Sequence, residues 1–336
     1  MGVYIEFDKP FKTYDEQIDY LRTHYHLMIP DRNFARDVLS TISYYDLING
    51  YQDCMMYDGI FKNKVSPEYL IHFYSFDKSF QNVLLKNSLL VENIFKTKLA
   101  YVIAENFGIS MYDYLRPQNF KNNYRRNIYF YKVKKDIDNR LERFKPLPTQ
   151  YYIEKHHHVP PWILLKNVEF GNAINLYKLL KAPQKEAVAT SMLSFINASK
   201  NDKINFLTSA LGLIKEYRNV IAHNLKFITY TSSKNMLPLQ TTFNILPYPI
   251  LTNGIKSFDN IYAYILAVTI LLQLPLLRAR FCYDLTNIFL ETHNGERLQV
   301  LDRIAADYIN IIELPIDFNQ RLEWILRNWQ KLSEPK

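Results

Sequence analysis

Apolar residues recur at intervals of three and four along most of the chain, a spacing that predicts amphipathic helices and a mainly α fold. The first helix should begin after Thr13, because Thr13 and Glu16 form a Thr-x-x-Glu capping box just ahead of apolar residues. Further helices are predicted over residues 34–48, from Pro67 through residue 85, and over residues 89–107, where Gly108 provides a stop signal.

A long helix is also predicted over residues 204–225, where the apolar positions gather into one stripe at about 100° per residue. Arg218 falls inside this stripe, and a charged group at an apolar position needs a partner or a function. Asn219 and His223 fall with Glu216 on the opposite side of the helix. The stripe consists of Leu207, Leu211, Ile214, Tyr217, Ile221 and Leu225.

Three other segments bear on the domain organisation. Prolines at both ends predict an extended connection over residues 146–161, between an N-terminal helical region (1–145) packed into the same core and a second helical region (162–336). Residues 227–249 are rich in Thr, Ser, Asn and Pro, which predicts a small β-hairpin or irregular insert. The uncharged run 260–277 contains Tyr, Gln and Pro, so we interpret it as a core helix rather than a membrane span.

Charge favours a polyanionic partner. The 336 residues carry a formal net charge of +8, with a pI of about 9.1, which suits nucleic acid better than a membrane surface. Residues 121–145 interleave basic and aromatic side chains, a pattern typical of surfaces that follow a phosphate backbone and stack bases. A solvated helix face is the alternative, because acidic residues dilute the charge. The candidate RNA contacts in this segment are Arg125, Arg126, Lys132, Lys134 and Lys135.

Composition excludes several other classes of protein. Only 8 glycines occur, and neither G-x-G-x-x-G nor G-x-x-x-x-G-K-[ST] is present, which argues against a Gly-rich nucleotide-binding fold. Cys54 and Cys282 are too few for a disulfide framework, and the first residues lack the layout of a signal peptide, so we expect a cytoplasmic protein. Side chains of the consecutive residues 156–158, all histidine, diverge, so we expect no metal site and no cofactor.

Arg218 and His223 are separated by four residues, the R-x4-H spacing of HEPN ribonucleases. The guanidinium of arginine is planar and permanently charged, which suits phosphate oxygens, and the imidazole of histidine exchanges a proton near neutral pH. The two side chains lie about 140° apart on an ideal helix, so on a straight helix they cannot both contact one phosphate. Either the helix breaks near the motif or a second copy of the chain supplies half of the site. The structural alternative is that Arg218 pairs with a carboxylate while His223 is solvated near a helix end.

Several separated blocks resemble the bacterial abortive-infection AbiD/AbiF family, whose members carry a HEPN domain. The blocks keep their order from Lys9 to His223, well over half of the chain, and the family carries its R-x4-H motif where Arg218 and His223 stand. The chain departs from the family pattern at Asp46, where an arginine is expected. The matching blocks are Lys9-Pro10-Phe11, Thr13 to Ile18, Ile42 to Tyr45, Gly50-Tyr51, Tyr74 to Asp77, Glu92, Thr97, Leu99 to Tyr101, Pro161-Trp162 and Phe170-Gly171.

The resemblance implies a HEPN-like helical bundle with additional N-terminal helices, a role in phage defence, and association with a small noncoding RNA. We therefore predict a metal-independent endoribonuclease that acts as a toxin or effector in abortive infection. His223 would serve as general base on a ribose 2′-OH or as acid on the leaving 5′-oxygen, while Arg218 stabilises the phosphorane oxygens. Asn219 would orient His223 or contact phosphate, and Glu92 is a weaker candidate for anchoring Arg218.

Because the motif occurs once, we predict a homodimer in which two chains complete the site around a two-fold axis. The main alternative is a non-cleaving RNA-binding protein that holds a noncoding RNA in a defence or toxin–antitoxin complex. A third possibility is a structural or sensor protein whose motif supports dimerisation.

Overall fold

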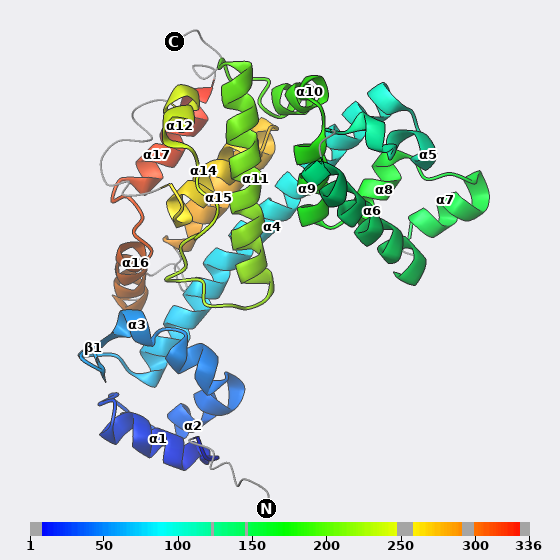
Figure 1. Cartoon of the computed structure of the whole chain (residues 1–336). Helices are drawn as coiled ribbons and strands as arrows, with labels where there is room; N and C mark the ends of the chain where they lie inside the picture. Colours follow the sequence, from blue (N-terminus) through cyan, green and yellow to red (C-terminus); the bar gives the residue numbers. More distant parts are fainter. Residues whose placement is uncertain (1–8, 122–123, 145–146, 247–257, 291–298, 330–336) are drawn as a thin grey trace, which may run out of the picture. The chain divides into compact units, whose positions relative to one another are not determined.

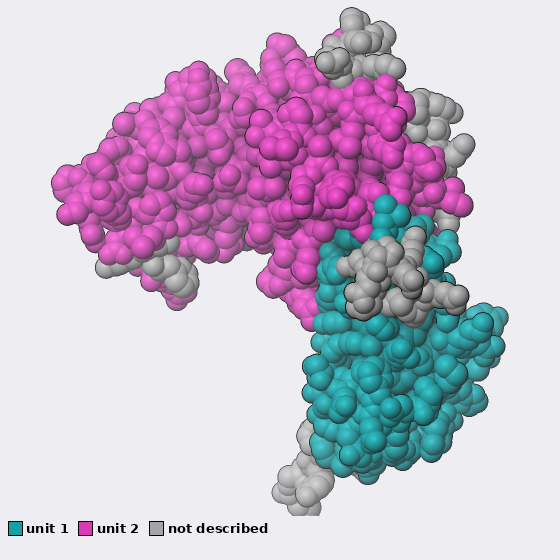
Figure 2. Space-filling model, turned by 180° about the vertical axis from the view of Figure 1, so that it is seen from behind, with its two compact units in different colours: residues 1–81, 226–229, 288–312 teal, residues 82–225, 230–287, 313–336 magenta. Residues whose placement is uncertain are grey.

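The computed structural model describes residues 9–121, 124–144, 147–246, 258–290 and 299–329, and it is mainly α as predicted (Figure 1). Within these residues the one sheet is a small antiparallel hairpin of β1 (Met56–Tyr57) and β2 (Ile60–Phe61), with Met56 opposite Phe61. The chain divides into two compact units, which Figure 2 colours separately. Unit 1 comprises residues 1–81, 226–229 and 288–312, and unit 2 comprises residues 82–225, 230–287 and 313–336.

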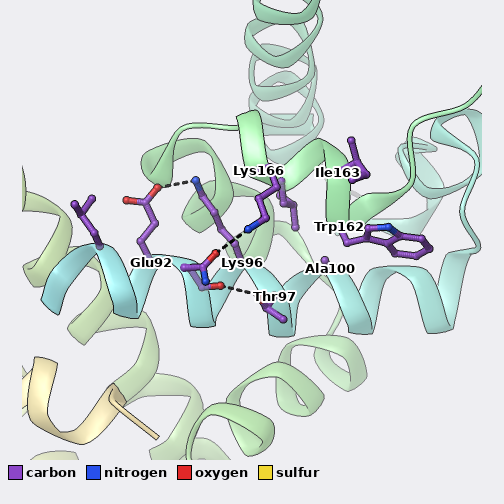
Figure 3. A pocket seen from close by; sticks show the side chains of 10 residues that line it. Glu92, Lys96, Thr97, Ala100, Trp162, Ile163 and Lys166 are labelled. Atoms are coloured by element: carbon purple, nitrogen blue, oxygen red, sulfur yellow. Dashed lines mark hydrogen bonds and ion pairs between the residues drawn. The ribbon is translucent and has the colours of Figure 1, made fainter. Parts of the chain in front are cut away.

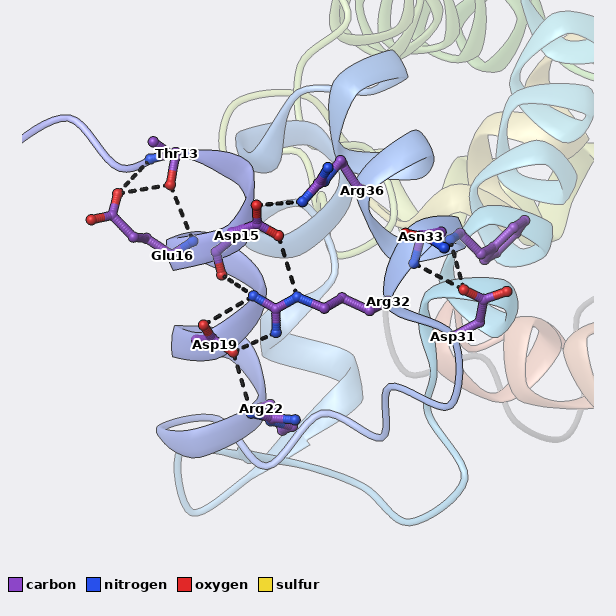
Figure 4. Close-up of polar contacts among 10 residues, drawn as sticks. Thr13, Asp15, Glu16, Asp19, Arg22, Asp31, Arg32, Asn33 and Arg36 are labelled. Carbon is purple, nitrogen blue, oxygen red and sulfur yellow. Dashed lines mark hydrogen bonds and ion pairs between the residues drawn. The ribbon is translucent and has the colours of Figure 1, made fainter.

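Unit 1 begins with α1 (Tyr14–Thr23), which carries the predicted capping box. The Glu16 amide donates to Thr13 Oγ1 at 3.3 Å, and the Thr13 amide donates to Glu16 Oε2 at 2.7 Å. Two arginines of α2 (Arg32–Thr41) then hold carboxylates of α1, and Arg32 Nη1 lies 2.6 Å from Asp19 Oδ1 (Figure 4). These side chains are exposed, so solvent screens the ion pairs and they contribute little to stability.

The prediction of a single helix over residues 34–48 is wrong. α2 ends at Thr41, because Ile42 is extended at φ −118° and ψ 132°. A short π-helix, η1 (Tyr45–Asn49), follows, and its Asp46 amide donates to Ser43 Oγ at 3.1 Å. A hydroxyl that competes for a backbone amide in this way favours a helix start over helix continuation, and the apolar spacing does not reveal it.

A buried carboxylate organises unit 1. Asp77 lies near the start of α4 (Pro67–Phe107) and accepts three hydrogen bonds: from Tyr51 Oη at 2.8 Å, from Gln81 Nε2 at 2.8 Å and from Tyr308 Oη at 2.7 Å. Tyr308 belongs to α16 (Gln299–Ile311), so the carboxylate links segments that are far apart in the sequence. Burial raises the pKa of Asp77, while the three donors act in the opposite direction.

Unit 2 is built around α11 (Lys200–Ala222), which packs against α9 (Phe170–Leu179), α10 (Ala182–Met192), α12 (Leu239–Ile245) and α14 (Ile261–Leu271). Every residue of α14 is buried, which confirms the core helix predicted in the run 260–277. Tyr217 of α11 stacks on Tyr264 of α14 with 4.8 Å between ring centroids. No helix among the described residues has the length and apolarity that crossing a bilayer requires.

α4 joins the two segments predicted from residue 67 to residue 107 into one continuous helix of 41 residues. The extended connection predicted over residues 146–161 is wrong, because α7 (Thr149–His156) occupies its middle. Pro148 and Pro160 are N-cap residues and Pro161 opens α8 (Pro161–Asn167), so these prolines start helices rather than prevent them. The segment 146–161 lies within unit 2.

The insert after the motif was predicted to be a small hairpin or irregular, and it is neither throughout, because its second half contains a helix. Its described residues, 227–246, form α12 and no strand, and residues 247–249 lie outside the described part of the chain. The remaining elements are α3 (Gln52–Met55), α5 (Met111–Tyr114), η2 (Pro117–Asn119), α6 (Tyr124–Phe144), α15 (Pro275–Ile288) and α17 (Phe318–Arg327).

Replacing Asp77 by Ala should lower the free energy of unfolding by about 3 kcal/mol, because two buried tyrosine hydroxyls and an amide lose their acceptor. Urea denaturation measures the change. Asp37→Ala, on the exposed surface of α2, is the matched control and should change stability by less than about 0.5 kcal/mol. A loss of similar size at both positions would contradict the role assigned to Asp77.

Candidate functional site

α11 ends at the R-x4-H motif. His223 is the C-cap residue, and Asn224 takes a left-handed conformation at φ 52°. The Leu225 amide donates to the Val220 carbonyl at 2.9 Å, and the Asn224 amide donates to the Ile221 carbonyl at 3.1 Å. This pair of bonds is a Schellman motif, which closes a helix by satisfying its last carbonyls. The angular argument left two alternatives, a helix break near the motif or a second copy of the chain, and the helix does end here, between Ala222 and Asn224.

The apolar stripe of α11 is buried as predicted at Leu207, Leu211, Ile214, Tyr217 and Ile221. The prediction is wrong at Leu225, which is 56% exposed, because the chain has already left the helix there. Arg218 lies beside the stripe with its side chain 28% exposed. His223 is exposed.

Glu92 of α4 anchors Arg218. Its carboxylate lies 3.5 Å from Arg218 Nη2 and accepts a hydrogen bond from Lys96 Nζ at 2.6 Å, the contact drawn in Figure 3. Arg218 Nη1 also donates to Asn219 Oδ1 at 3.0 Å. The buried Nε of Arg218 has no hydrogen-bond partner among the described residues. The guanidinium is thus held in place while part of its donor capacity stays unused.

Arg218, Asn219 and His223 line one cavity of about 640 Å³, which we call the basic pocket. Five cationic side chains line it against two carboxylates, Glu92 and Glu169. Asn172 and Asn175 add amide groups. The cations are Lys96, Arg140, Lys166, Lys215 and Arg218.

The first turn of α9 also borders the basic pocket, through Phe170, Gly171 and Asn172. The first amides of a helix have no partner within it, and the helix dipole places partial positive charge there. The N-cap residue Glu169 makes no side-chain cap bond, and its carboxylate pairs instead with Arg140 at 2.8 Å. Cationic side chains, free amides and a helix N-terminus together fit a polyanionic group such as phosphate.

The basic segment 121–145 contributes to the pocket through Arg140. Lys132 and Lys135 are exposed on α6 and do not line it, while Lys134 pairs with Asp138 at 2.6 Å. The side chains of Arg125 and Arg126 lie outside the described residues. Phe130 is a core residue rather than a stacking surface, because it is buried against Phe120 at 4.7 Å between centroids.

Glu216 does not join Asn219 and His223, contrary to the helical projection. Its carboxylate accepts from Tyr230 Oη, from Ser232 Oγ at 2.9 Å and from Asn235 Nδ2, all in the insert after the motif. Burial favours a higher pKa for Glu216, but these three donors outweigh it and hold the pKa below its usual range. Nearby, a Cβ on Gly212 would lie 2.4 Å from Asn235 Oδ1, so a glycine allows the insert to approach α11 closely.

Lys166 and Lys215 are pocket residues that sequence reasoning missed, since single lysines on separate helices carry no local signal. Residues 156–158, all histidine, are not gathered into a site, and His158 Nδ1 lies 2.8 Å from the His156 carbonyl. Within the described residues, no group of three or more His, Cys, Asp or Glu side chains is arranged to hold a metal ion.

The family model described as Abi-like protein matches residues 37–229, which is more than half of the chain. The match includes the R-x4-H motif and every residue that lines the basic pocket. The chain belongs to the Abi-like family. This membership connects the protein with abortive infection, a form of phage defence. Comparisons of the Abi-like chain with curated proteins and with solved structures gave no match.

In this Abi-like protein, the left-handed residue after His223 should tolerate glycine but not alanine. Asn224→Ala should lower the free energy of unfolding by about 1 kcal/mol, because a Cβ without a compensating polar group is strained at positive φ. Asn224→Gly should stay within about 0.5 kcal/mol of the wild type. Thermal or urea denaturation of both variants measures these changes. Equal stabilities of Asn224→Ala and Asn224→Gly would show that the cap does not constrain the motif.

Proposed function

We propose that this Abi-like protein is a HEPN-type endoribonuclease, independent of metal, that acts as a toxin or effector in abortive infection. The observation that carries the proposal is the convergence of Arg218, Asn219 and His223 on one basic pocket at the end of α11. Arg218 and His223 supply the two functions that cleavage of a ribose–phosphate backbone requires: stabilisation of phosphate charge and proton transfer.

The reaction uses the substrate's own nucleophile. The 2′-oxygen attacks the adjacent phosphorus, the bond from phosphorus to O5′ breaks, and His223 takes the proton from the 2′-OH. Arg218 stabilises the negative charge on the phosphorane oxygens, helped by the α9 N-terminus. Asn219 accepts a hydrogen bond from Arg218, so we assign it to positioning that guanidinium. The products are a 2′,3′-cyclic phosphate and a 5′-hydroxyl, and DNA is not cleaved because it lacks the 2′-OH.

The leaving O5′ needs a proton from a second group. Among the described residues that line the basic pocket, His223 is the one imidazole. We therefore propose a homodimer in which the partner's exposed His223 donates this proton, consistent with the exposure of His223 at a helix end. Sedimentation velocity at micromolar concentration would contradict this arrangement by finding only monomer.

Replacing His223 by Ala should reduce RNA cleavage by at least about 100-fold, because general acid–base catalysis is lost. Arg218→Ala should reduce it comparably, and it should also cost stability because Glu92 loses a partner. Cleavage is measured on radiolabelled RNA, with end analysis for cyclic phosphate. EDTA should leave the wild-type rate unchanged.

His156→Ala is the matched control, since His156 is an exposed histidine at the end of α7, outside the basic pocket. It should retain full activity. Cleavage that survives His223→Ala, or that stops with EDTA, would refute the mechanism. RNA binding without cleavage by the wild type would instead favour the alternative, a protein that holds a noncoding RNA.

We also propose that the exposed cations of α6 bind the RNA backbone, whether the RNA is a target or a cognate noncoding RNA. Lys132→Ala and Lys135→Ala should each reduce the log–log salt dependence of RNA binding by up to about 0.7 units, the value for one phosphate contact on a single strand. Lys134→Ala is a useful comparison, because Lys134 already pairs with Asp138. Slopes that stay at the wild-type value for Lys132→Ala and Lys135→Ala would remove α6 from the interface.

A further inference from the structure

A second, more apolar cavity adjoins the basic pocket in unit 2. It has a volume of about 340 Å³, and Figure 3 shows its lining. Glu92, Lys96 and Lys166 line both cavities, so they form a common wall. Its apolar lining comes from α4 and α8: Leu89, Ala100, Trp162, Ile163 and Leu165. We call this cavity the tryptophan pocket.

Trp162 is the largest side chain of the tryptophan pocket. It lies in the first turn of α8, directly after Pro161, and remains 47% exposed. Pro161, Leu164 and Leu165 are buried, so the short helix that presents the indole is fixed to the core. Leu89 of α4, which also lines the pocket, is 45% exposed. Exposed apolar side chains that line one cavity mark a binding site more often than isolated ones do.

The polar side chains of the tryptophan pocket are also held in place, by hydrogen bonds and an ion pair. Lys166 Nζ donates to Asn93 Oδ1 at 3.3 Å, Thr97 Oγ1 donates to the Asn93 carbonyl at 2.8 Å, and Lys96 pairs with Glu92 (Figure 3). A flat apolar group with polar edges in this cavity would therefore have both an indole and amide or ammonium groups within the lining to contact. Nucleobases have this character, and they stack on aromatic side chains with little dependence on sequence.

We propose that the tryptophan pocket holds the base of a ribonucleotide whose phosphate occupies the basic pocket, with the base stacked on Trp162. This inference rests on the proposed function for the identity of RNA as the ligand. The shared wall supports it, because base and phosphate of one nucleotide are joined through the ribose and must occupy adjoining sites. Lys96 and Lys166, which line both cavities, contact the nucleotide between its base and its phosphate.

The test compares adenosine 5′-monophosphate with ribose 5-phosphate, which carries the same phosphate but no base. The wild-type protein should bind the nucleotide about tenfold more tightly than the sugar phosphate, the advantage that stacking of one base provides. Trp162→Ala should abolish this advantage and leave affinity for ribose 5-phosphate unchanged, whereas Trp162→Phe should keep most of it. Calorimetry measures both ligands, and binding of the nucleotide should quench the fluorescence of the wild type more than that of Trp162→Phe.

Tyr151→Ala provides the matched control, because Tyr151 is an exposed aromatic residue of α7 outside both pockets. It should behave as the wild type. An advantage for the nucleotide that persists in Trp162→Ala, or no advantage in the wild type, would overturn the proposal. The assay needs no turnover, so a protein that binds the nucleotide through Trp162 but does not cleave RNA would refute the nuclease while supporting the base site.

Discussion

The partial burial of a permanent charge on α11 determines how the candidate site is built. Arg218 follows the buried Tyr217 and precedes the buried Val220 and Ile221, and such a position is stable only if the guanidinium is paired. Glu92 of α4 supplies the partner at 3.5 Å, and its second oxygen is taken by Lys96. One carboxylate therefore serves two cations. The pocket keeps an excess of positive charge, which an anionic ligand can neutralise.

At the end of α11, by contrast, the imidazole of His223 does not stabilise the helix end. The helix is closed by the backbone bonds of Asn224 and Leu225 rather than by the imidazole. Beyond the motif, the insert is held to α11 through Glu216 and the close approach at Gly212. The direction of the chain after His223 is thus set by groups outside the basic pocket, and the imidazole stays exposed at the end of the helix.

Predictions from the sequence were correct for features that depend on residues close together in the chain. The capping box of Thr13 and Glu16, the buried stripe of α11 and the apolar run of α14 each depend on neighbours within a few turns. Predictions from the sequence were wrong where one residue type occurs in two kinds of structure. Prolines at 148, 160 and 161 are compatible with a connection and with helix starts, and the structure uses them as helix starts.

The candidate site was predictable only in part for the same reason. Spacing identifies Arg218 and His223, and a helical projection shows that one straight helix cannot bring both to one phosphate, but the projection cannot show which helices face them. Lys166, Lys215 and the first turn of α9 reach the basic pocket through tertiary packing. Arg140 reaches it from a segment whose other described basic residues do not line it. A projection of α11 alone also misplaces Glu216, because the insert draws that carboxylate into its own hydrogen bonds.

The blocks that resemble the abortive-infection family separate into two groups in the structure. Tyr51 and Asp77 are joined by a buried hydrogen bond of 2.8 Å in unit 1, and Thr13 with Glu16 closes a helix start, so these residues account for the fold. A second group gathers in unit 2 at the two adjoining cavities, where family blocks supply residues from α4, α8, α9 and α11. That group comprises Glu92, Thr97, Ala100, Trp162, Phe170, Gly171, Arg218, Asn219 and His223. Ala100 and Phe170 of this group are also buried core residues. Trp162, Arg218 and His223 instead keep exposed surface at the two cavities, where a ligand could reach them. The meeting of this second group, more than the R-x4-H spacing itself, is the structural argument for a functional site at the end of α11.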